Sequence, residues 1–155
     1  MSNVKETVSA TANRELSMTR LFNAPRKLVW EVWTKPEHIK NWWGPNGFTN
    51  TIFTMDVKNG GVWDFIMHGP DGTDYKNKNV FAEVVKPEKI IYDHVTDPIH
   101  RTTITFEEQG NKTLVTMTMV FETVELKQEV VNKFKADIGL TQNMNKLEEY
   151  LTKLS

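Results

Sequence analysis

The chain has 155 residues, of which 39% are hydrophobic and 25% charged, so it can bury a sizeable core and is not expected to be disordered. Its formal net charge is −1 and it contains no cysteine, which excludes a basic nucleic-acid surface, disulfides, thiolate metal ligands and a cysteine nucleophile. Its apolar runs are far shorter than the ~20 residues that span a bilayer, so no membrane insertion is expected.

The first part of the chain predicts a lead, a strand and two short helices. Residues 1–12 are polar, without a signal-peptide core, and are expected to form a flexible lead to one cytoplasmic domain at residues 13–155. Apolar residues alternate over 13–22, which predicts a strand. Pro25 suits a helix start, and apolar spacing predicts a helix over 25–33.

The form of a capping box at Thr34-x-x-Glu37 predicts the second short helix, which ends at Trp42-Trp43-Gly44-Pro45. Tryptophan is well suited to wall an apolar space. Two adjacent tryptophans before a Gly-Pro break therefore indicate an aromatic-lined interior that a loop closes at one end.

Short turns separate the next strands, which predicts antiparallel pairing. Asn59-Gly60 is a strong hairpin signal, and Gly69-Pro70-Asp71-Gly72 suits a type I turn. Strands are predicted at residues 48–57, 61–68, 78–85, 89–95, 100–108 and 112–121.

A long helix is predicted over residues 124–154. Its apolar positions form two stripes, and the shift between them falls at Gly139, where we expect the helix to bend. This helix is the only predicted element long enough to cover one face of the sheet. The sequence therefore predicts an α+β fold with a helix-grip arrangement.

Strand parity predicts which side chains face that helix, because alternate residues point to opposite faces. The predicted inner face is rich in Trp, Phe and Met, which fits either a packed core with Met as gap filler or an apolar pocket. Candidate lining residues are Trp63, Phe65, Met67, Met117 and Met119 on strands, with Phe134 and Ile138 on the helix. Candidate rim residues are Trp43, Tyr75 and Tyr92.

Catalytic and metal-binding motifs are not found. The sequence has no phosphate-binding loop, no dinucleotide fingerprint, no HExxH and no serine-hydrolase elbow. His68 and Asp64 share the face predicted to lie away from the helix, as a solvated pair. Tyr92 and His94 would be polar groups in an apolar cavity if their face is internal. No catalytic residue, metal or cofactor is therefore expected.

The ordered motifs nevertheless resemble a known family. They are Arg20-x-Phe22-x-Ala24-Pro25, Val29-Trp30-x-x-Trp33-Thr34-x-Pro36-Glu37, Trp42-Trp43-Gly44-Pro45-x-Gly47-Phe48, Asp56-x-x-x-Gly60-Gly61-x-Trp63, Met67-His68-Gly69-Pro70-Asp71-Gly72, Pro87-Glu88-Lys89 and Gly139-x-x-Gln142-x-x-x-x-Leu147. Over residues 13–153 the chain resembles the AHSA1-like family, the homologues of the activator of Hsp90 ATPase, within the START/Bet v 1-like (SRPBCC) superfamily.

The resemblance implies a curved seven-stranded antiparallel sheet around a long C-terminal helix, with a cavity between them. It carries no catalytic motif to this chain. It also does not bring Hsp90 activation with it, because the eukaryotic co-chaperones have a separate N-terminal domain that contributes to chaperone contact. A chaperone partner is therefore left open without sequence support, and the oligomeric state is not predicted.

Three functions follow as hypotheses. The first is binding of a lipid-like or polycyclic aromatic small molecule in the cavity. The second is a cyclase or hydrolase that uses the same cavity with Tyr92, His94 or Asp74 as proton donors or acceptors. The third is a chaperone-linked interaction module that uses a surface patch.

Overall fold

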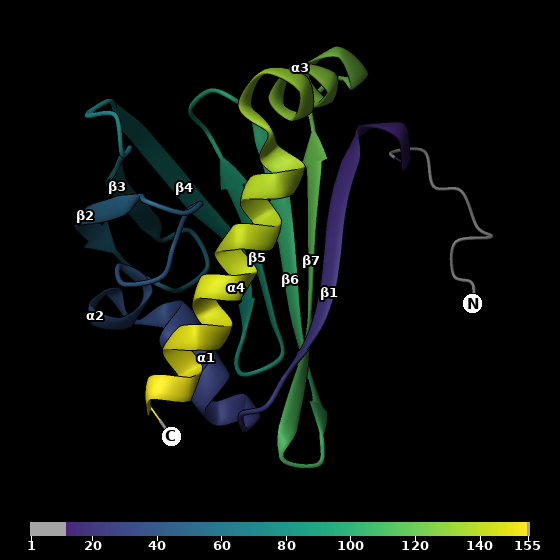
Figure 1. Ribbon diagram of the computed structural model, residues 1–155. Coiled ribbons are helices and arrows are strands. Elements are labelled where there is room, and N and C mark those ends of the chain that lie inside the picture. Colours follow the sequence, from purple (N-terminus) through teal and green to yellow (C-terminus); the bar gives the residue numbers. More distant parts are fainter. Residues whose placement is uncertain (1–11, 155) are drawn as a thin grey trace.

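The computed structural model describes residues 12–154 and contains one seven-stranded antiparallel sheet (Figure 1). The expected flexible lead at residues 1–12 lies, apart from Ala12, outside the described residues. The strands lie in the order β1-β7-β6-β5-β4-β3-β2, so the first and last strands pair and every other pairing joins consecutive strands. The strands are β1 (Glu15–Phe22), β2 (Thr49–Met55), β3 (Val62–His68), β4 (Asp74–Val85), β5 (Lys89–His94), β6 (His100–Gln109) and β7 (Lys112–Phe121).

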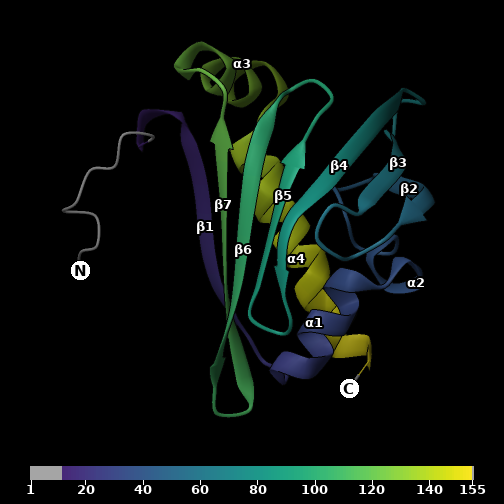
Figure 2. The same ribbon diagram turned by 180° about the vertical axis from the view of Figure 1, so that it is seen from behind.

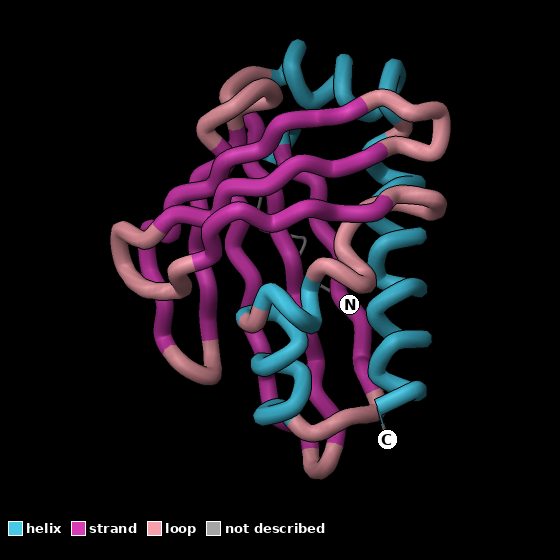
Figure 3. Tube along the Cα trace, turned by 90° about the vertical axis from the view of Figure 1, so that its left-hand side faces the viewer, coloured by secondary structure: helices cyan, strands magenta, loops and turns pink. Residues whose placement is uncertain are grey.

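Within residues 12–154, four α-helices accompany the sheet, and they confirm the predicted helix-grip fold. They are α1 (Arg26–Thr34), α2 (Pro36–Ile39), α3 (Val124–Phe134) and α4 (Ala136–Leu154). Helix α4 runs along one face of the curved sheet, in front of it in Figure 1 and behind it in Figure 2. The tube in Figure 3 shows the sheet curling toward α4, so that face is concave.

The predicted capping box before α2 is wrong. The Thr34 hydroxyl donates to the carbonyl of Trp30, 2.7 Å away within α1, and is therefore not available to cap α2. Lys35 occupies the N-cap position of α2 without a side-chain hydrogen bond, and Pro36 begins the helix. The helix ends at Ile39, so the paired tryptophans follow it in a turn.

The predicted bend at Gly139 is also wrong, because the C-terminal helix breaks four residues earlier. Lys135 adopts the left-handed conformation, with φ 55° and ψ 45°, and its N–H donates to the carbonyls of Val130 and Val131. This C-cap ends α3, and α4 starts at the next residue. Gly139 instead allows close packing, since a Cβ there would lie 3.2 Å from Cγ of Pro45.

The hydrophobic core lies between the concave face, α4 and the two short helices. Its largest fully buried side chains include Trp42, Phe65, Phe106 and Met144. The indole of Trp42 donates to the carbonyl of Val32 over 3.1 Å, which fixes the paired tryptophans against α1. The core therefore extends without a break from the tryptophan cluster to the inner face of the strands.

Candidate functional site

Aromatic rings cover the concave face on strands β3, β4 and β5. The Trp63 ring stacks on Phe65, with centroids 4.6 Å apart, and meets the Tyr92 ring edge-on at 5.8 Å. Phe81 lies parallel to Trp63 at 6.5 Å, and Trp43 tilts against Trp63 at 5.1 Å. Alternation along each strand places these rings on the same face, which makes them one continuous wall.

Helix α4 covers this wall. One stripe of the helix is buried, namely Leu140, Met144, Leu147 and Leu151 together with Asn143. The backbone of α4 approaches that of the sheet most closely at β1. Large side chains therefore fill the space between α4 and the strands farther from β1.

The loop between α2 and β2, residues 44–48, is held to α4 by three side chains. The N–H of Gly44 donates to Oδ1 of Asn143 at 3.0 Å, and the N–H of Asn46 donates to Oε1 of Gln142 at 3.1 Å. The ammonium of Lys146 donates to the carbonyl of Pro45 at 3.2 Å. These contacts form a latch, which we define as residues 44–48 with Gln142, Asn143 and Lys146. It closes one side of the interior.

Several polar side chains are buried among the apolar ones. On the concave strands, Asn79 and Thr102 are 1% and 0% exposed, respectively. Oδ1 of Asn79, Oγ1 of Thr102 and Nε1 of Trp63 have no hydrogen-bond partner among the described residues. Buried polar groups are normally satisfied, so these three atoms mark a place where the wall differs from ordinary core.

Two stacked histidines lie on the same face, near the end of the sheet that α3 covers. The rings of His94 and His100 are 4.7 Å apart, and Nδ1 of each lies within 3.0 Å of the Pro98 carbonyl. Burial is the main cause that lowers the pKa of both, to about 4 for His100. A carbonyl oxygen only accepts, so Nδ1 of each ring donates to Pro98, and the lowered pKa favours the neutral form of both rings.

Burial also acts on Tyr92. It raises the pKa of the phenol, an effect that the neighbouring Thr102 hydroxyl partly offsets. The two hydroxyls are near enough to interact, but Oγ1 of Thr102 makes no hydrogen bond of normal geometry. Tyr92 is therefore protonated at neutral pH.

Of the ten candidate site residues, the structure buries five. These are Trp43, Trp63, Phe65, Tyr92 and Met117. Met67 and Met119 are half-buried, and Met67 packs against the core. Tyr92 is buried and belongs to the wall rather than to a rim, with its ring against that of Trp63.

Phe134 and Ile138 do not face the sheet, contrary to the prediction. They are 59% and 53% exposed. The break at Lys135 places Phe134 in a separate helix, and Ile138 lies about 200° around α4 from the buried Leu140 at 100° per residue. The inner stripe of α4 starts only at Leu140.

Tyr75 and Asp74 lie in strand β4, which begins four residues before the predicted strand at residues 78–85. Tyr75 is exposed, with its ring 5.9 Å from that of Phe48. Asp74 contacts Nδ1 of His68 at 2.7 Å, and Thr51 lies 2.8 Å from Nε2 of the same ring. His68 thus pairs with Asp74 and not with Asp64, on the convex face, and Asp74 does not meet Tyr92 or His94.

Sequence reasoning missed the wall residues Phe81, Asn79 and Thr102, and the latch residue Asn143. The alternation of β4 could have found Phe81 and Asn79 together, since both are buried on one face. Thr102 occupies a position of the same parity as Ile104 and Phe106, which was a usable signal. No local signal marks Asn143.

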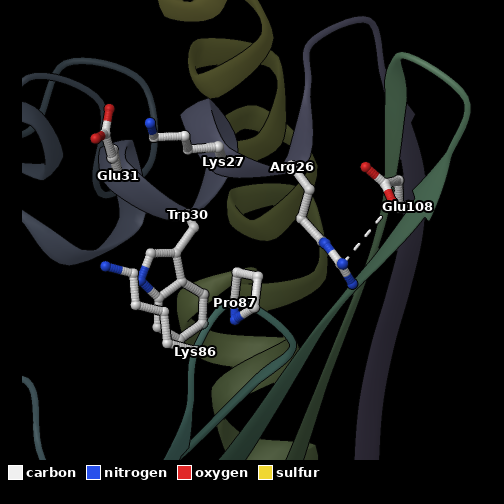
Figure 4. Close-up of a pocket in the computed structure, with 7 residues that line it drawn as sticks. All are labelled: Arg26, Lys27, Trp30, Glu31, Lys86, Pro87 and Glu108. Carbon is white, nitrogen blue, oxygen red and sulfur yellow. Dashed lines mark ion pairs between the residues drawn. The ribbon is translucent and has the colours of Figure 1, made fainter.

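Two surface pockets lie outside this interior. The larger, of about 470 Å³, lies between α1, the turn from β4 to β5 and the end of β6 (Figure 4). The rings of Trp30 and Pro87 both line it, and Arg26 faces Glu108 at 3.8 Å. The other, of about 440 Å³, lies beside α2 and β2.

Within residues 12–154 no helix combines the length and apolarity needed to cross a membrane. In the same range no three His, Asp or Glu side chains gather in a way that could hold a metal ion.

Comparison with solved structures finds the same fold in bacterial proteins. A protein from Arthrobacter aurescens superposes with a TM-score of 0.86 at 24% identity, covering 95% of this chain and 93% of that one. A Mycobacterium smegmatis protein gives 0.83 at 23% identity, covering 94% and 95%. An AHSA1-like protein from Aeromonas hydrophila gives 0.71 at 18% identity, covering 90% and 93%.

A search of curated proteins found no match. Residues 23–152 match the family described as activator of Hsp90 ATPase homolog 1-like protein, which is most of the chain. The match agrees with the helix-grip fold and with the resemblance in the ordered motifs. The chain therefore belongs to the activator of Hsp90 ATPase homolog 1-like family, within the SRPBCC superfamily.

Proposed function

We propose that this protein binds a hydrophobic small molecule between the concave face of the sheet and α4. The observation that carries the proposal is the composition of that space. It holds Trp63, Phe65, Tyr92, Met117 and Met144, which all belong to one buried cluster. Methionine is unbranched and adapts to different neighbours, so a wall of aromatic rings and Met side chains can repack around a guest.

The superfamily supports this proposal, since it includes proteins that bind hydrophobic ligands in the same place. Burial of apolar surface would supply most of the affinity, at about 25 cal/mol per Å² before ordering costs. A lipid-like molecule or a flat polycyclic aromatic fits the chemistry of the wall.

Entry would need the interior to open, because its side chains are almost fully buried. We propose that the loop of residues 44–48 parts from α4 at the latch. Few bonds hold this loop to the helix, and Gln142 makes its bond at an exposed position. The left-handed residue Lys135, directly before the first residue of α4, offers a hinge.

A titration with a blocking variant tests the proposal. Naphthalene and pyrene are the probes, and tryptophan emission together with backbone NMR shifts are the readouts. We expect saturable changes at residues of β3, β7 and α4. Met117→Trp adds a ring to the interior and should weaken binding at least tenfold, whereas Thr118→Trp, on the opposite face of β7, should not.

Met117→Trp should also overpack the interior and lower the free energy of unfolding by about 1–3 kcal/mol, so binding is compared only between folded proteins. Should Met117→Trp not fold, Met144→Phe is the second blocking variant. Saturable changes confined to α1 and the turn from β4 to β5 would assign binding to the pocket in Figure 4 and would contradict the proposal.

A further inference from the structure

Three polar atoms of the concave wall are buried and make no hydrogen bond of normal geometry among the described residues, although the Thr102 hydroxyl lies near that of Tyr92. They are Nε1 of Trp63, Oδ1 of Asn79 and Oγ1 of Thr102. The three side chains are at most 2% exposed. A buried polar group without a partner loses its hydration and gains nothing in return, so apolar residues of the same shape would suit a pure core better.

The three residues occupy one region of the wall. Trp63 and Asn79 are register partners across β3 and β4, yet neither atom bonds to the other. Thr102 is the register partner of Tyr92 across β5 and β6, and the Tyr92 ring touches the Trp63 ring at 5.8 Å. The three residues thus lie on the same face of the sheet, with Thr102 beside Tyr92 and Asn79 beside His94 in the strand register.

The chemistry of these atoms is complementary. An indole N–H only donates and the amide oxygen of Asn79 only accepts, while the hydroxyl of Thr102 does both. A hydroxyl group placed between Trp63 and Asn79 can accept from the first and donate to the second. A bare hydrocarbon satisfies none of them.

The wall is also uncharged. The buried polar side chains of residues 13–154 are Asn79, His94, His100, Thr102, Thr113 and Asn143. None of these carries a fixed charge, and burial lowers the pKa of both histidines. A carboxylate entering this space would lose its hydration without gaining a cation, which is strongly unfavourable.

We infer that the interior takes a neutral, largely apolar molecule with one hydroxyl group, which bonds to Nε1 of Trp63 and Oδ1 of Asn79 next to Thr102. This inference rests on the proposed function. It narrows the ligand class from any hydrophobic molecule to alcohols and phenols. Asn79, Trp63 and Thr102 are then the specificity-determining residues.

Three probes of one shape test the inference by calorimetry at pH 7: naphthalene, 2-naphthol and 2-naphthoate. The measured quantity is the hydroxyl preference, which is the dissociation constant of naphthalene divided by that of 2-naphthol. In Asn79→Leu we expect this preference to fall about tenfold, because removal of the acceptor leaves the hydroxyl unpaired. 2-Naphthoate should bind weakest of the three.

Thr102→Val and Thr103→Val form a matched pair, because each removes one hydroxyl at constant shape. Thr102 faces the wall and Thr103 the convex side. The first should lower the hydroxyl preference several-fold, and the second should leave it unchanged. If Asn79→Leu does not fold, the threonine pair still tests the inference. The NMR signal of the Trp63 indole proton is a second measurement, because 2-naphthol should shift it further downfield than naphthalene does.

The outcomes separate the two claims. If naphthalene and 2-naphthol bind but the hydroxyl preference is the same in wild type, Asn79→Leu and Thr102→Val, the inference is overturned and the proposed function stands. Tightest binding by 2-naphthoate overturns the inference in the same way. If none of the three probes binds, the proposed function itself has failed.

Discussion

The backbone N–H of Gly44 donates a 3.0 Å hydrogen bond to Oδ1 of Asn143, which lies 99 positions later in the chain. This bond ties the loop after the paired tryptophans to the buried stripe of α4. The loop thus closes the interior from the side of the tryptophan cluster, and the latch connects the first third of the chain to its last helix.

The latch predicts a stability difference between two neighbouring variants. Asn143→Ala should lower the free energy of unfolding by about 1–3 kcal/mol, because it leaves the buried N–H of Gly44 without an acceptor. Gln142→Ala removes an exposed bond to Asn46 and should change it by less than about 0.5 kcal/mol. Urea denaturation of both proteins measures the two values, and equal losses would show that the buried bond has no special weight.

The break between α3 and α4 predicts a stabilising variant. Lys135 holds φ 55°, a region that disfavours a side chain with a Cβ. Lys135→Gly should therefore raise the free energy of unfolding by about 0.5–1 kcal/mol, measured by thermal and urea denaturation. Lys133→Gly, inside α3, is the control and should lower it by about as much. A loss of stability in Lys135→Gly would contradict the left-handed C-cap.

The sequence predicted the fold well, because period-2 alternation and turn signals are local. The inner positions of β3 at Trp63 and Phe65 follow directly from alternation. The break at Lys135 could not be found in this way, since lysine has no preference for a left-handed conformation, and Gly139 was the more plausible bend. The prediction treated residues 124–154 as one continuous helix, and counting 100° per residue across the break at Lys135 wrongly turned Phe134 and Ile138 toward the sheet.

The candidate site was predictable only in its apolar part. Residue type and strand parity point to Trp63 and Met117, but unpaired polar atoms become visible only when every partner is placed in space. Alternation gives Asn79 and Thr102 inward positions, but nothing in the sequence shows that their polar atoms lack hydrogen-bond partners. The bond of Asn143 to Gly44 depends on the meeting of two distant segments, which no local pattern encodes.

The buried His100 predicts a pH dependence of stability. Its pKa is about 4 in the folded protein, lowered mainly by burial, against about 6.5 when unfolded. Between these two pKa values the unfolded state therefore binds more protons than the folded state. The stability that comes from burying neutral His100 is fully present above pH 6.5 and is lost as the pH falls toward 4. The loss should be on the order of 3 kcal/mol.

Urea denaturation at pH 7 and pH 4.5 checks this dependence in wild type and in His100→Gln. The carboxylates contribute equally to both proteins, so the difference between their pH slopes measures His100 together with its repulsion of the stacked His94. The variant should be less sensitive to pH over this window. Identical slopes would mean that His100 is solvated or that its proton is accommodated in the folded state.

A hydrophobic molecule is proposed to bind between the sheet and α4. The most direct test measures intermolecular NOEs from bound 2-naphthol to the methyl groups of selectively labelled methionines. The account predicts NOEs to Met117 on β7 and Met144 on α4 from the same ligand, because both side chains are buried in the shared interior. NOEs to neither methyl, from a ligand that binds saturably, would place it elsewhere on the molecule and would contradict the account.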